Sequence, residues 1–131
     1  MTAPALPGPR ATVVVVSDRS ASGERPDRSG PRAVELLRAA GLDVGDPVVV
    51  PDGVESVARA LGAALDSGAR VVITSGGTGV GSRDLTPEGT RDVIERELPG
   101  LAEALRRNGE RHVATAAVSY THLTLPTNRE V

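Results

Sequence analysis

The sequence predicts an α/β domain built on a parallel sheet with right-handed crossovers. Short apolar runs alternate with stretches of helical periodicity, which is the order expected of strand–helix–strand units. The first run, Thr12–Val16 (TVVVV), is β-branched at every position and does not alternate with polar residues. A strand of this kind is buried on both faces, as the central strands of parallel sheets are.

A helix is expected after this strand. Pro31 suits its first position, and Gly41 suits the position just after its last turn. Val48–Val50 is then expected as a second, short strand. The apolar residues of the helix recur at i, i+3, i+4 and i+7, and they are Ala33, Leu36, Leu37 and Ala40.

The second predicted helix starts at Asp52 and is ended by Gly68. Val71–Thr74 follows as a third strand that is again expected to be covered on both faces. The buried stripe of the helix is made of Val54, Val57, Ala58, Leu61 and Leu65.

A glycine-rich turn, Ser75–Gly81, and two more helices complete the predicted order β-α-β-α-β-loop-α-α. Thr86–Pro87 opens the first of these helices, with threonine as its N-cap and proline at its first position. Pro99–Gly100 separates it from the second helix, Leu101–Asn108. The buried side of the first helix is expected to carry Val93 and Ile94.

The composition excludes several classes of protein. A chain of 131 residues fits one domain, and a net charge of −2 gives no basic surface for nucleic acid or anionic lipid. All 15 basic residues are arginine, so lysine-based phosphate loops and Schiff bases are excluded. With no cysteine, two histidines, no Phe and no Trp, thiolate metal sites, disulfides, histidine metal clusters and aromatic stacking surfaces are excluded as well.

Residues 1–10 are expected to form a flexible N-terminal arm. This segment contains three prolines and a glycine but no apolar core of a secretory signal. No stretch approaches the roughly 18 apolar residues that span a membrane. We therefore expect a cytoplasmic protein without a membrane partner.

Three loops follow predicted strands and should open at one edge of the sheet, where parallel α/β sheets bind ligands. They are Ser17–Gly30, Pro51–Gly53 and Ser75–Thr86. The most specific motif begins at the end of the third strand, as Thr74, Ser75, Gly76, Gly77, Thr78 and Gly79. Glycines allow successive amides to form an anion-binding nest, and the hydroxyls add uncharged donors. A plain tight turn fits the motif equally well, because neither GxxxxGK[ST] nor an intact GxGxxG is present.

Two aspartates lie in these loops, and each has a structural alternative to a functional role. Asp52 and Glu55 resemble a capping box, which stabilises a helix by about 1 kcal/mol. Asp84 is placed to accept hydrogen bonds from loop amides. Their functional alternative is to bind a metal ion or to organise charge.

The first loop offers a second place for a phosphate. Ser17 and Asp18 open it, and Ser29 and Gly30 stand at the start of the helix that follows, where amides favour anions. The alternative is a solvated polar loop.

A carboxylate about 4 Å from a phosphate oxygen is repelled by roughly 4 kcal/mol at an effective dielectric constant of 20. Because a divalent cation reverses this repulsion, aspartates beside a phosphate cradle indicate Mg²⁺ and a nucleotide.

At these residues the chain resembles the MogA/MoaB molybdopterin-binding family, which includes the G domain of gephyrin. The resemblance covers about residues 11–119. It is carried by VSDR (Val16–Arg19), SGP (Ser29–Pro31), VPD (Val50–Asp52), TSGGTG (Thr74–Gly79), RDLTPE (Arg83–Glu88), and PG followed by EALR (Pro99–Gly100, Glu103–Arg106).

The resemblance implies a three-layer α/β/α fold and a role in molybdenum cofactor biosynthesis. Catalytic members of the family use Mg-ATP to adenylylate molybdopterin and release pyrophosphate. By motif, Asp52 and Asp84 match the catalytic aspartates, which would organise Mg²⁺ and the reacting phosphates, while Thr74–Gly79 matches the ligand-binding turn. Members are commonly homotrimers, and some are hexamers.

Two features depart from the family pattern. Gly89 stands where alanine is usual, which predicts a helix weaker by about 1 kcal/mol. The resemblance stops at Ser119, so we expect a domain that is incomplete at its C-terminus, followed by a non-family tail at 120–131. Alanine, frequent before residue 118, does not occur after it. Loss of a strand–helix unit would leave a sheet edge unpaired, which predicts an aggregation-prone chain of doubtful activity.

Three functions are compatible with these motifs. The first is a molybdopterin adenylyltransferase, favoured because both aspartates are present. The second is a MoaB- or CinA-type module that binds a pterin or nucleotide without turnover. The third, a phospho-acceptor signalling domain, is disfavoured because Asp18 is a poor acidic cluster and the chain has no lysine.

Overall fold

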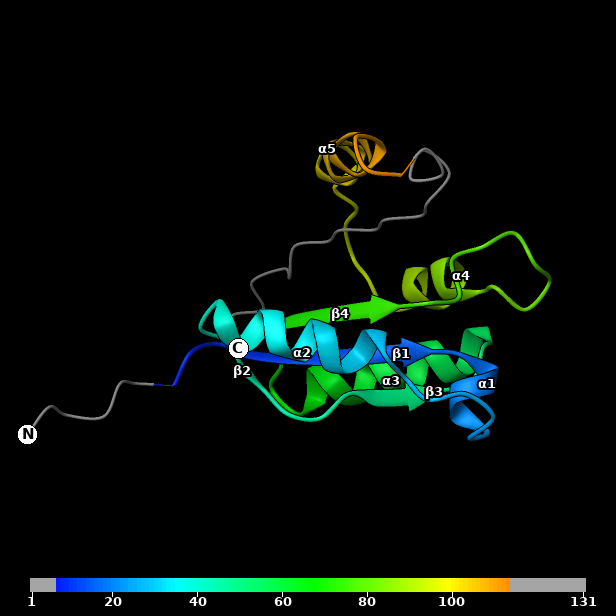
Figure 1. Cartoon of the computed structure of the whole chain (residues 1–131), viewed down its shortest axis with the longest axis horizontal. Helices are drawn as coiled ribbons and strands as arrows, with labels where there is room; N and C mark the ends of the chain where they lie inside the picture. The colour runs from blue at the N-terminus through cyan, green and yellow to red at the C-terminus, as the bar shows by residue number, and fades with distance from the viewer. Residues whose placement is uncertain (1–6, 114–131) are drawn as a thin grey trace, which may run out of the picture.

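The computed structural model describes residues 7–113, which form four parallel strands and five helices. The strands and helices that build the layered body are placed in Figure 1. The strands are β1 (Arg10–Val16), β2 (Asp43–Val44), β3 (Val48–Val50) and β4 (Val71–Ser75). The helices are α1 (Asp18–Ala21), α2 (Ser29–Ala39), α3 (Val54–Asp66), α4 (Thr86–Arg91) and α5 (Pro99–Glu110).

Strand β1 lies at the centre of the sheet. Strand β2 pairs with its beginning, with Ala11 opposite Val44, and β3 pairs with its end. Strand β4 runs along its other side, in parallel throughout, with Ala11 opposite Val71. The prediction of a parallel sheet is therefore confirmed, and the carboxyl ends of β1, β3 and β4 meet at one edge.

The two faces of β1 belong to two separate apolar cores. Val13 and Val15 pack toward α2, whereas Val14 and Val16 pack toward α3. These four side chains are between 0% and 4% exposed. Burial of each contributes roughly 1.5–3 kcal/mol, which explains why an unbroken β-branched run forms the central strand. Helices thus cover both faces of the sheet, and the expected three-layer α/β/α arrangement is confirmed (Figure 1).

The structure corrects several predicted helix boundaries. Helix α2 begins at Ser29, so Pro31 is its third residue and not its first. Helix α4 ends at Arg91, so Val93 and Ile94 follow the helix, although Val93 still packs against the core on the α3 side. Two members of the predicted apolar stripes are exposed, Leu36 at 54% and Leu65 at 49%. The short elements α1 and β2 were not predicted, because each is too short for a hydrophobic period to be recognised.

Gly89 has a packing role that the helix-propensity argument missed. A Cβ atom at position 89 would lie 2.7 Å from the Cβ of Val57 and 2.8 Å from the carbonyl oxygen of Val54. The glycine is buried in α4 where that helix meets α3. Because glycine has no side chain, α3 and α4 can approach closely at this position. The predicted weakening of α4 counted helix propensity alone and did not include this gain in packing.

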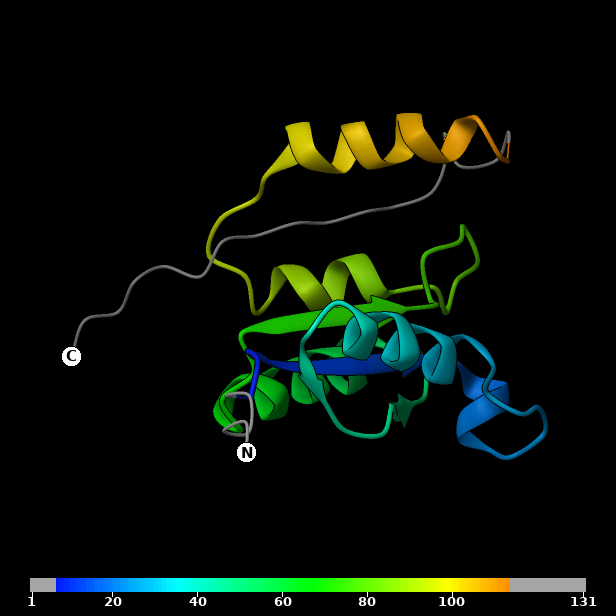
Figure 2. The ribbon, with the colours of Figure 1, turned by 60° about the vertical axis from the view of Figure 1, so that its left-hand side comes forward.

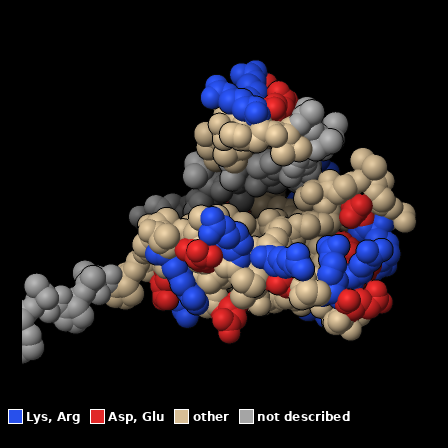
Figure 3. Space-filling model, in the orientation of Figure 1, with Lys and Arg blue, Asp and Glu red and all other residues tan. Residues whose placement is uncertain are grey.

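Helix α5 stands apart from the layered body in both ribbon views (Figure 2). In the view of Figure 3, the visible charged side chains of this helix lie on the side away from the sheet. Leu101 and Leu105 on this helix are more than half exposed, at 56% and 53%. No helix within residues 7–113 has the length and apolar character needed to cross a membrane.

Candidate functional site

A cavity of about 620 Å³ opens at the carboxyl edge of the sheet. It is formed by the end of β1, the start of α2 and the loops after β3 and β4. In Figure 1 this is the end of the molecule where α1 lies. Its lining consists of Val15, Val16, Ser17, Ser20, Arg25, Pro26, Asp27, Arg28, Ser29, Asp52, Ser75, Gly76, Gly77 and Asp84.

The turn after β4 is possible only with glycine at two successive positions. Gly76 and Gly77 have φ angles of 99° and 66°, in the left-handed region that L side chains rarely adopt. A Cβ atom at Gly76 would collide with the carbonyl oxygen of Val16, and one at Gly77 would collide with Oγ1 of Thr86. The two glycines thus let the turn lie directly against the end of the central strand.

Several backbone amides of this turn are available to a ligand. Within residues 7–113, the N–H groups of Gly77, Thr78 and Gly79 donate to no protein acceptor. Of these three residues, Gly77 lines the cavity. Backbone amides without a protein acceptor distinguish an anion-binding nest from a turn whose N–H groups are all bonded within the protein.

Thr86 forms two hydrogen bonds to the glycine turn and is not the N-cap residue that the sequence predicts. The residue before α4 is Leu85, and Thr86 is the first residue of the helix, so its hydroxyl does not cap the helix. Instead, its Oγ1 donates to the carbonyl of Gly76 at 2.9 Å, and its N–H donates to the carbonyl of Gly77 at 3.1 Å. The side chain is 2% exposed, so both bonds are protected from water.

Asp52 also has a partner other than the one predicted. Gly53 occupies the N-cap position of α3, and no side chain caps that helix, so the capping box with Glu55 does not form. The carboxylate of Asp52 accepts a hydrogen bond from the N–H of Asp18 at 3.0 Å. In return, the carboxylate of Asp18 accepts one from the N–H of Asp52 at 3.1 Å. The pair joins the loops after β1 and β3.

Arg83 extends this junction to the loop after β4. Its Nε and one terminal nitrogen donate to the two carboxylate oxygens of Asp18 at 2.6 and 3.0 Å, and it also donates to the carbonyl oxygen of Asp52 at 3.0 Å. The hydrogen bonds from Arg83 lower the pKa of the Asp18 carboxyl group, and Asp18 raises the pKa of Arg83 in turn. Arg83 was not among the site residues predicted from the sequence. Its position directly before Asp84 was the indication that could have identified it.

Asp84 reaches the same cavity as Asp52. Its Oδ2 accepts a hydrogen bond from the N–H of Gly81 at 2.9 Å, which is the loop-stabilising role considered above. Within the described residues this is the sole hydrogen bond to its carboxylate, so the second oxygen remains available. The structural and functional roles of Asp84 are therefore compatible.

The predicted binding residues divide into two groups. The cavity lining contains Ser17, Ser29, Asp52, Ser75, Gly76, Gly77 and Asp84, and it does not contain Asp18, Gly30, Thr74, Thr78 or Gly79. Within the first group, the Ser75 hydroxyl donates to the Ser29 hydroxyl at 3.1 Å. The N–H of Gly30 is already taken by the carboxylate of Asp27, at 3.0 Å, and is not free for a phosphate.

The donor set fits a magnesium ion that is shared with a ligand. In the described part of the chain, no three acidic or histidine side chains gather as a ready-made metal cluster. Asp52 and Asp84 would supply two carboxylates. Mg²⁺ is commonly held by one or two carboxylates, with water and substrate phosphates completing its octahedron.

These features define an α/β domain with a cavity at the carboxyl edge of its parallel sheet, lined by a glycine turn and by the carboxylates of Asp52 and Asp84. The chain belongs to the molybdopterin-binding family: residues 12–130 match the family described as "probable molybdopterin binding domain". The matched range continues past Ser119, where we placed the end of the resemblance. Residues 120–131 lie outside the described part of the chain.

Relatives and solved structures agree with this assignment. The molybdopterin adenylyltransferase of Pyrococcus furiosus is 42% identical over 106 residues, which cover 81% of this chain and 62% of that protein. The molybdenum cofactor biosynthesis bifunctional protein of Synechococcus elongatus is 39% identical over 105 residues, covering 80% of this chain and 33% of its own length. A molybdopterin biosynthesis protein from Mycobacterium abscessus, 41% identical, superposes with a TM-score of 0.83 over 89% of this chain and 74% of its own. The chain thus spans less than two thirds of either curated relative.

Proposed function

We propose that this chain acts in molybdenum cofactor biosynthesis as a molybdopterin adenylyltransferase. In this reaction an oxygen of the pterin phosphate attacks the α-phosphorus of ATP. A new P–O–P bond forms, the bond to the β-phosphate breaks, and pyrophosphate leaves. The observation that carries the proposal is that Asp52 and Asp84, from two different loops, line one cavity beside the glycine turn.

The residues of the cavity have complementary roles in this proposal. Asp52 and Asp84 would hold Mg²⁺, which when bound neutralises the charge of the ATP phosphates. The free N–H groups of Gly77, Thr78 and Gly79 are suited to donate to phosphate oxygens as negative charge develops on them. Arg83 and Asp18 would hold the backbone of Asp52 in place, so that the carboxylates keep their positions during the transfer.

The test is AMP transfer to molybdopterin with Mg-ATP, measured with α-labelled ATP on the full 131-residue chain. Asp84→Asn keeps the size of the side chain and removes its charge, and we expect the rate to fall by about 10²- to 10³-fold. Asp66→Asn is the matched control, because this exposed residue ends α3 and does not line the cavity. Molybdopterin binding without AMP transfer would replace the enzyme by the binding-only module.

Assembly as a homotrimer, which the family resemblance implies, belongs to the same proposal. Light scattering coupled to size-exclusion chromatography measures it directly. A monodisperse monomer would contradict this part of the proposal without affecting the chemistry of the cavity.

A further inference from the structure

We propose that Arg25 and Arg28 form a separate anion subsite of this cavity, which binds a phosphate monoester without a metal ion. The inference rests on the proposed function, in which two phosphorylated substrates meet: ATP and the monoester of molybdopterin. It assigns the monoester to the arginines and leaves the metal-bound triphosphate to Asp52 and Asp84.

The guanidinium groups of Arg25 and Arg28 are unpaired in the described part of the chain. Arg25 and Arg28 both line the cavity, from the loop that leads into α2. Neither side chain has a carboxylate or carbonyl partner within residues 7–113. By contrast, the Arg83 guanidinium donates hydrogen bonds to both carboxylate oxygens of Asp18. Two unpaired guanidinium groups beside a cavity are suited to bidentate binding of phosphate.

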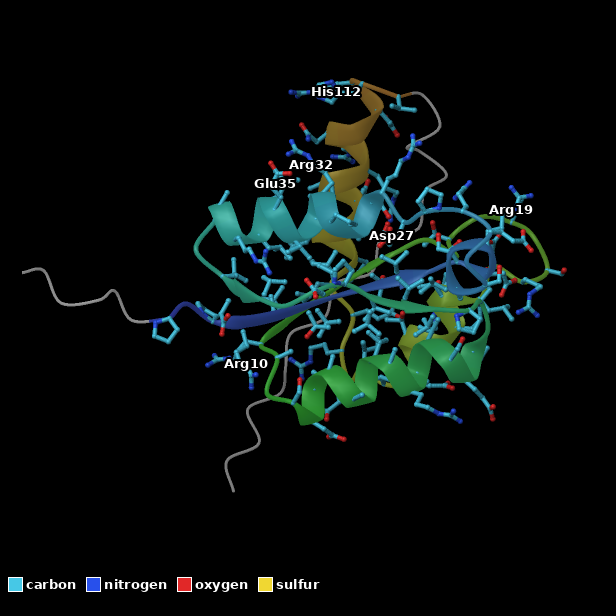
Figure 4. All side chains as sticks on the ribbon, turned by 60° about the horizontal axis from the view of Figure 1, so that its bottom comes forward. Arg10, Arg19, Asp27, Arg32, Glu35 and His112 are labelled. Atoms are coloured by element: carbon cyan, nitrogen blue, oxygen red, sulfur yellow. The ribbon has the colours of Figure 1, made fainter. Side chains whose placement is uncertain are left out.

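One carboxylate, that of Asp27, lies between these arginines in the sequence. Asp27 lines the cavity as well, and its Oδ1 accepts the N–H of Gly30 in the first turn of α2. Figure 4 places Asp27 at the beginning of that helix. Because Asp27 is engaged by the helix amide and forms no ion pair with Arg25 or Arg28 within 4.0 Å, the positive charge of the two arginines is left for a ligand.

The glycine turn after β4 contacts both loops, one after the other. At its start, Ser75 is hydrogen bonded to Ser29, next to Arg28. Two residues later, a Cβ atom on Gly77 would lie 3.1 Å from Oδ1 of Asp52. The turn therefore runs from the loop that carries the arginines to the loop that carries the acidic residue. A monoester at the first place and a metal-bound triphosphate at the second would each meet charge of the opposite sign.

The charge distribution around this end of the molecule is mixed and not uniformly basic (Figure 3). Two other arginines of this region have acidic partners: Arg32 pairs with Glu35 at 3.1 Å on the outer side of α2, as Figure 4 shows, and Arg83 pairs with Asp18. Arg25 and Arg28 differ from them in that both line the cavity.

The experiment measures binding of molybdopterin in EDTA, by pterin fluorescence, before and after its phosphate is removed with phosphatase. The unaltered chain should bind the phosphorylated form at least about tenfold more tightly. In the double variant Arg25→Ala/Arg28→Ala this preference should disappear, while the affinity for the dephosphorylated form stays within about twofold. The double variant Arg25→Lys/Arg28→Lys should recover part of the preference, because lysine keeps the charge but not the planar fork.

Arg70→Ala is the matched control. This exposed arginine precedes β4 at the opposite edge of the sheet and does not line the cavity. Its thermal midpoint and that of the double alanine variant should equal that of the unaltered chain, so that a binding defect is not a folding defect. If the double alanine variant retains the phosphate preference, the subsite is refuted. If the preference depends on the arginines but no AMP is transferred, the subsite stands and the proposed adenylylation fails.

Discussion

Asp18 and Asp52, which are 34 positions apart in the chain, exchange hydrogen bonds: each carboxylate accepts the backbone N–H of the other residue. The arrangement uses one carboxylate oxygen of Asp52 and leaves its Oδ1 near the glycine turn, about 3.1 Å from where a Cβ of Gly77 would lie. A residue proposed to bind a metal is thereby held by its backbone and by one oxygen, while the other oxygen faces the turn that would contact the substrate.

Arg83 completes this junction, and its removal should affect catalysis more than stability. We expect Arg83→Gln to lower kcat for AMP transfer by roughly 10- to 100-fold, because small displacements of reacting groups have effects of this size. The unfolding midpoint should change little, since exposed ion pairs contribute little to stability and the Arg83 side chain is 64% exposed. Arg83→Lys keeps the charge but loses the two-pronged contact with Asp18, so partial recovery of kcat would separate the role of geometry from that of charge. Equal rates for Arg83→Gln and the unaltered chain would refute the positioning role.

The same junction predicts a pH dependence of stability. The hydrogen bonds from Arg83 lower the folded-state pKa of Asp18 from its ordinary value of 3.8. A carboxyl with a lowered folded pKa stabilises the fold at pH values above its unfolded pKa, and this stabilisation is lost as the pH falls through the folded pKa. The difference in free energy of unfolding between the unaltered chain and Asp18→Asn should therefore be constant above about pH 5 and shrink below about pH 3.8. Urea titrations over this range measure it, and a difference that grows toward acid pH would contradict the assigned pKa direction.

Thr86 should stabilise the site through its hydroxyl and not through its bulk. Thr86→Val keeps the shape of this buried side chain but leaves the carbonyl of Gly76 without its donor, which should cost about 1–3 kcal/mol of unfolding free energy. Thr86→Ser keeps the donor and should lose less, by about the value of one buried methyl group, roughly 1 kcal/mol. Denaturant unfolding of both variants makes the comparison. A valine variant as stable as the serine variant would show that the hydrogen bond to the turn is unimportant.

The strands and the edge of the sheet that carries the cavity could be predicted because their signals are local. A β-branched run such as Thr12–Val16 defines a central strand by itself, and strand direction then places the loops together. The partners of Asp52 and Arg83 could not be predicted, because they lie 34 and 65 positions away and leave no periodic pattern. Local rules offered a capping box for Asp52 and a cap for Thr86. Tertiary hydrogen bonds to Asp18 and Gly76 took precedence at both positions.

Gly77 should tolerate no side chain. Its φ of 66° and the collision of a Cβ atom with Oγ1 of Thr86 mean that Gly77→Ala combines backbone strain with a clash. We expect a loss of about 1–3 kcal/mol of unfolding free energy and loss of AMP transfer. Gly45→Ala is the control, because a Cβ atom there would meet nothing within 4 Å. If Gly77→Ala is as stable and as active as Gly45→Ala, the turn does not have the conformation described.

Two helical glycines should respond to the same substitution with opposite signs. At Gly62, in α3, an added Cβ atom would meet nothing within 4 Å, so Gly62→Ala should raise the free energy of unfolding by about 0.5–1 kcal/mol through helix propensity alone. At Gly89, in α4, the added atom would lie 2.7 Å from the Cβ of Val57. Overpacking of this kind typically costs 1–3 kcal/mol, which is about equal to or larger than the same propensity gain. Gly89→Ala should therefore destabilise the chain. Urea unfolding of the two variants side by side distinguishes close packing from helix propensity as the reason for Gly89. If both substitutions stabilise the chain, α4 can move away from α3 without loss, and Gly89 is only a weak helix former.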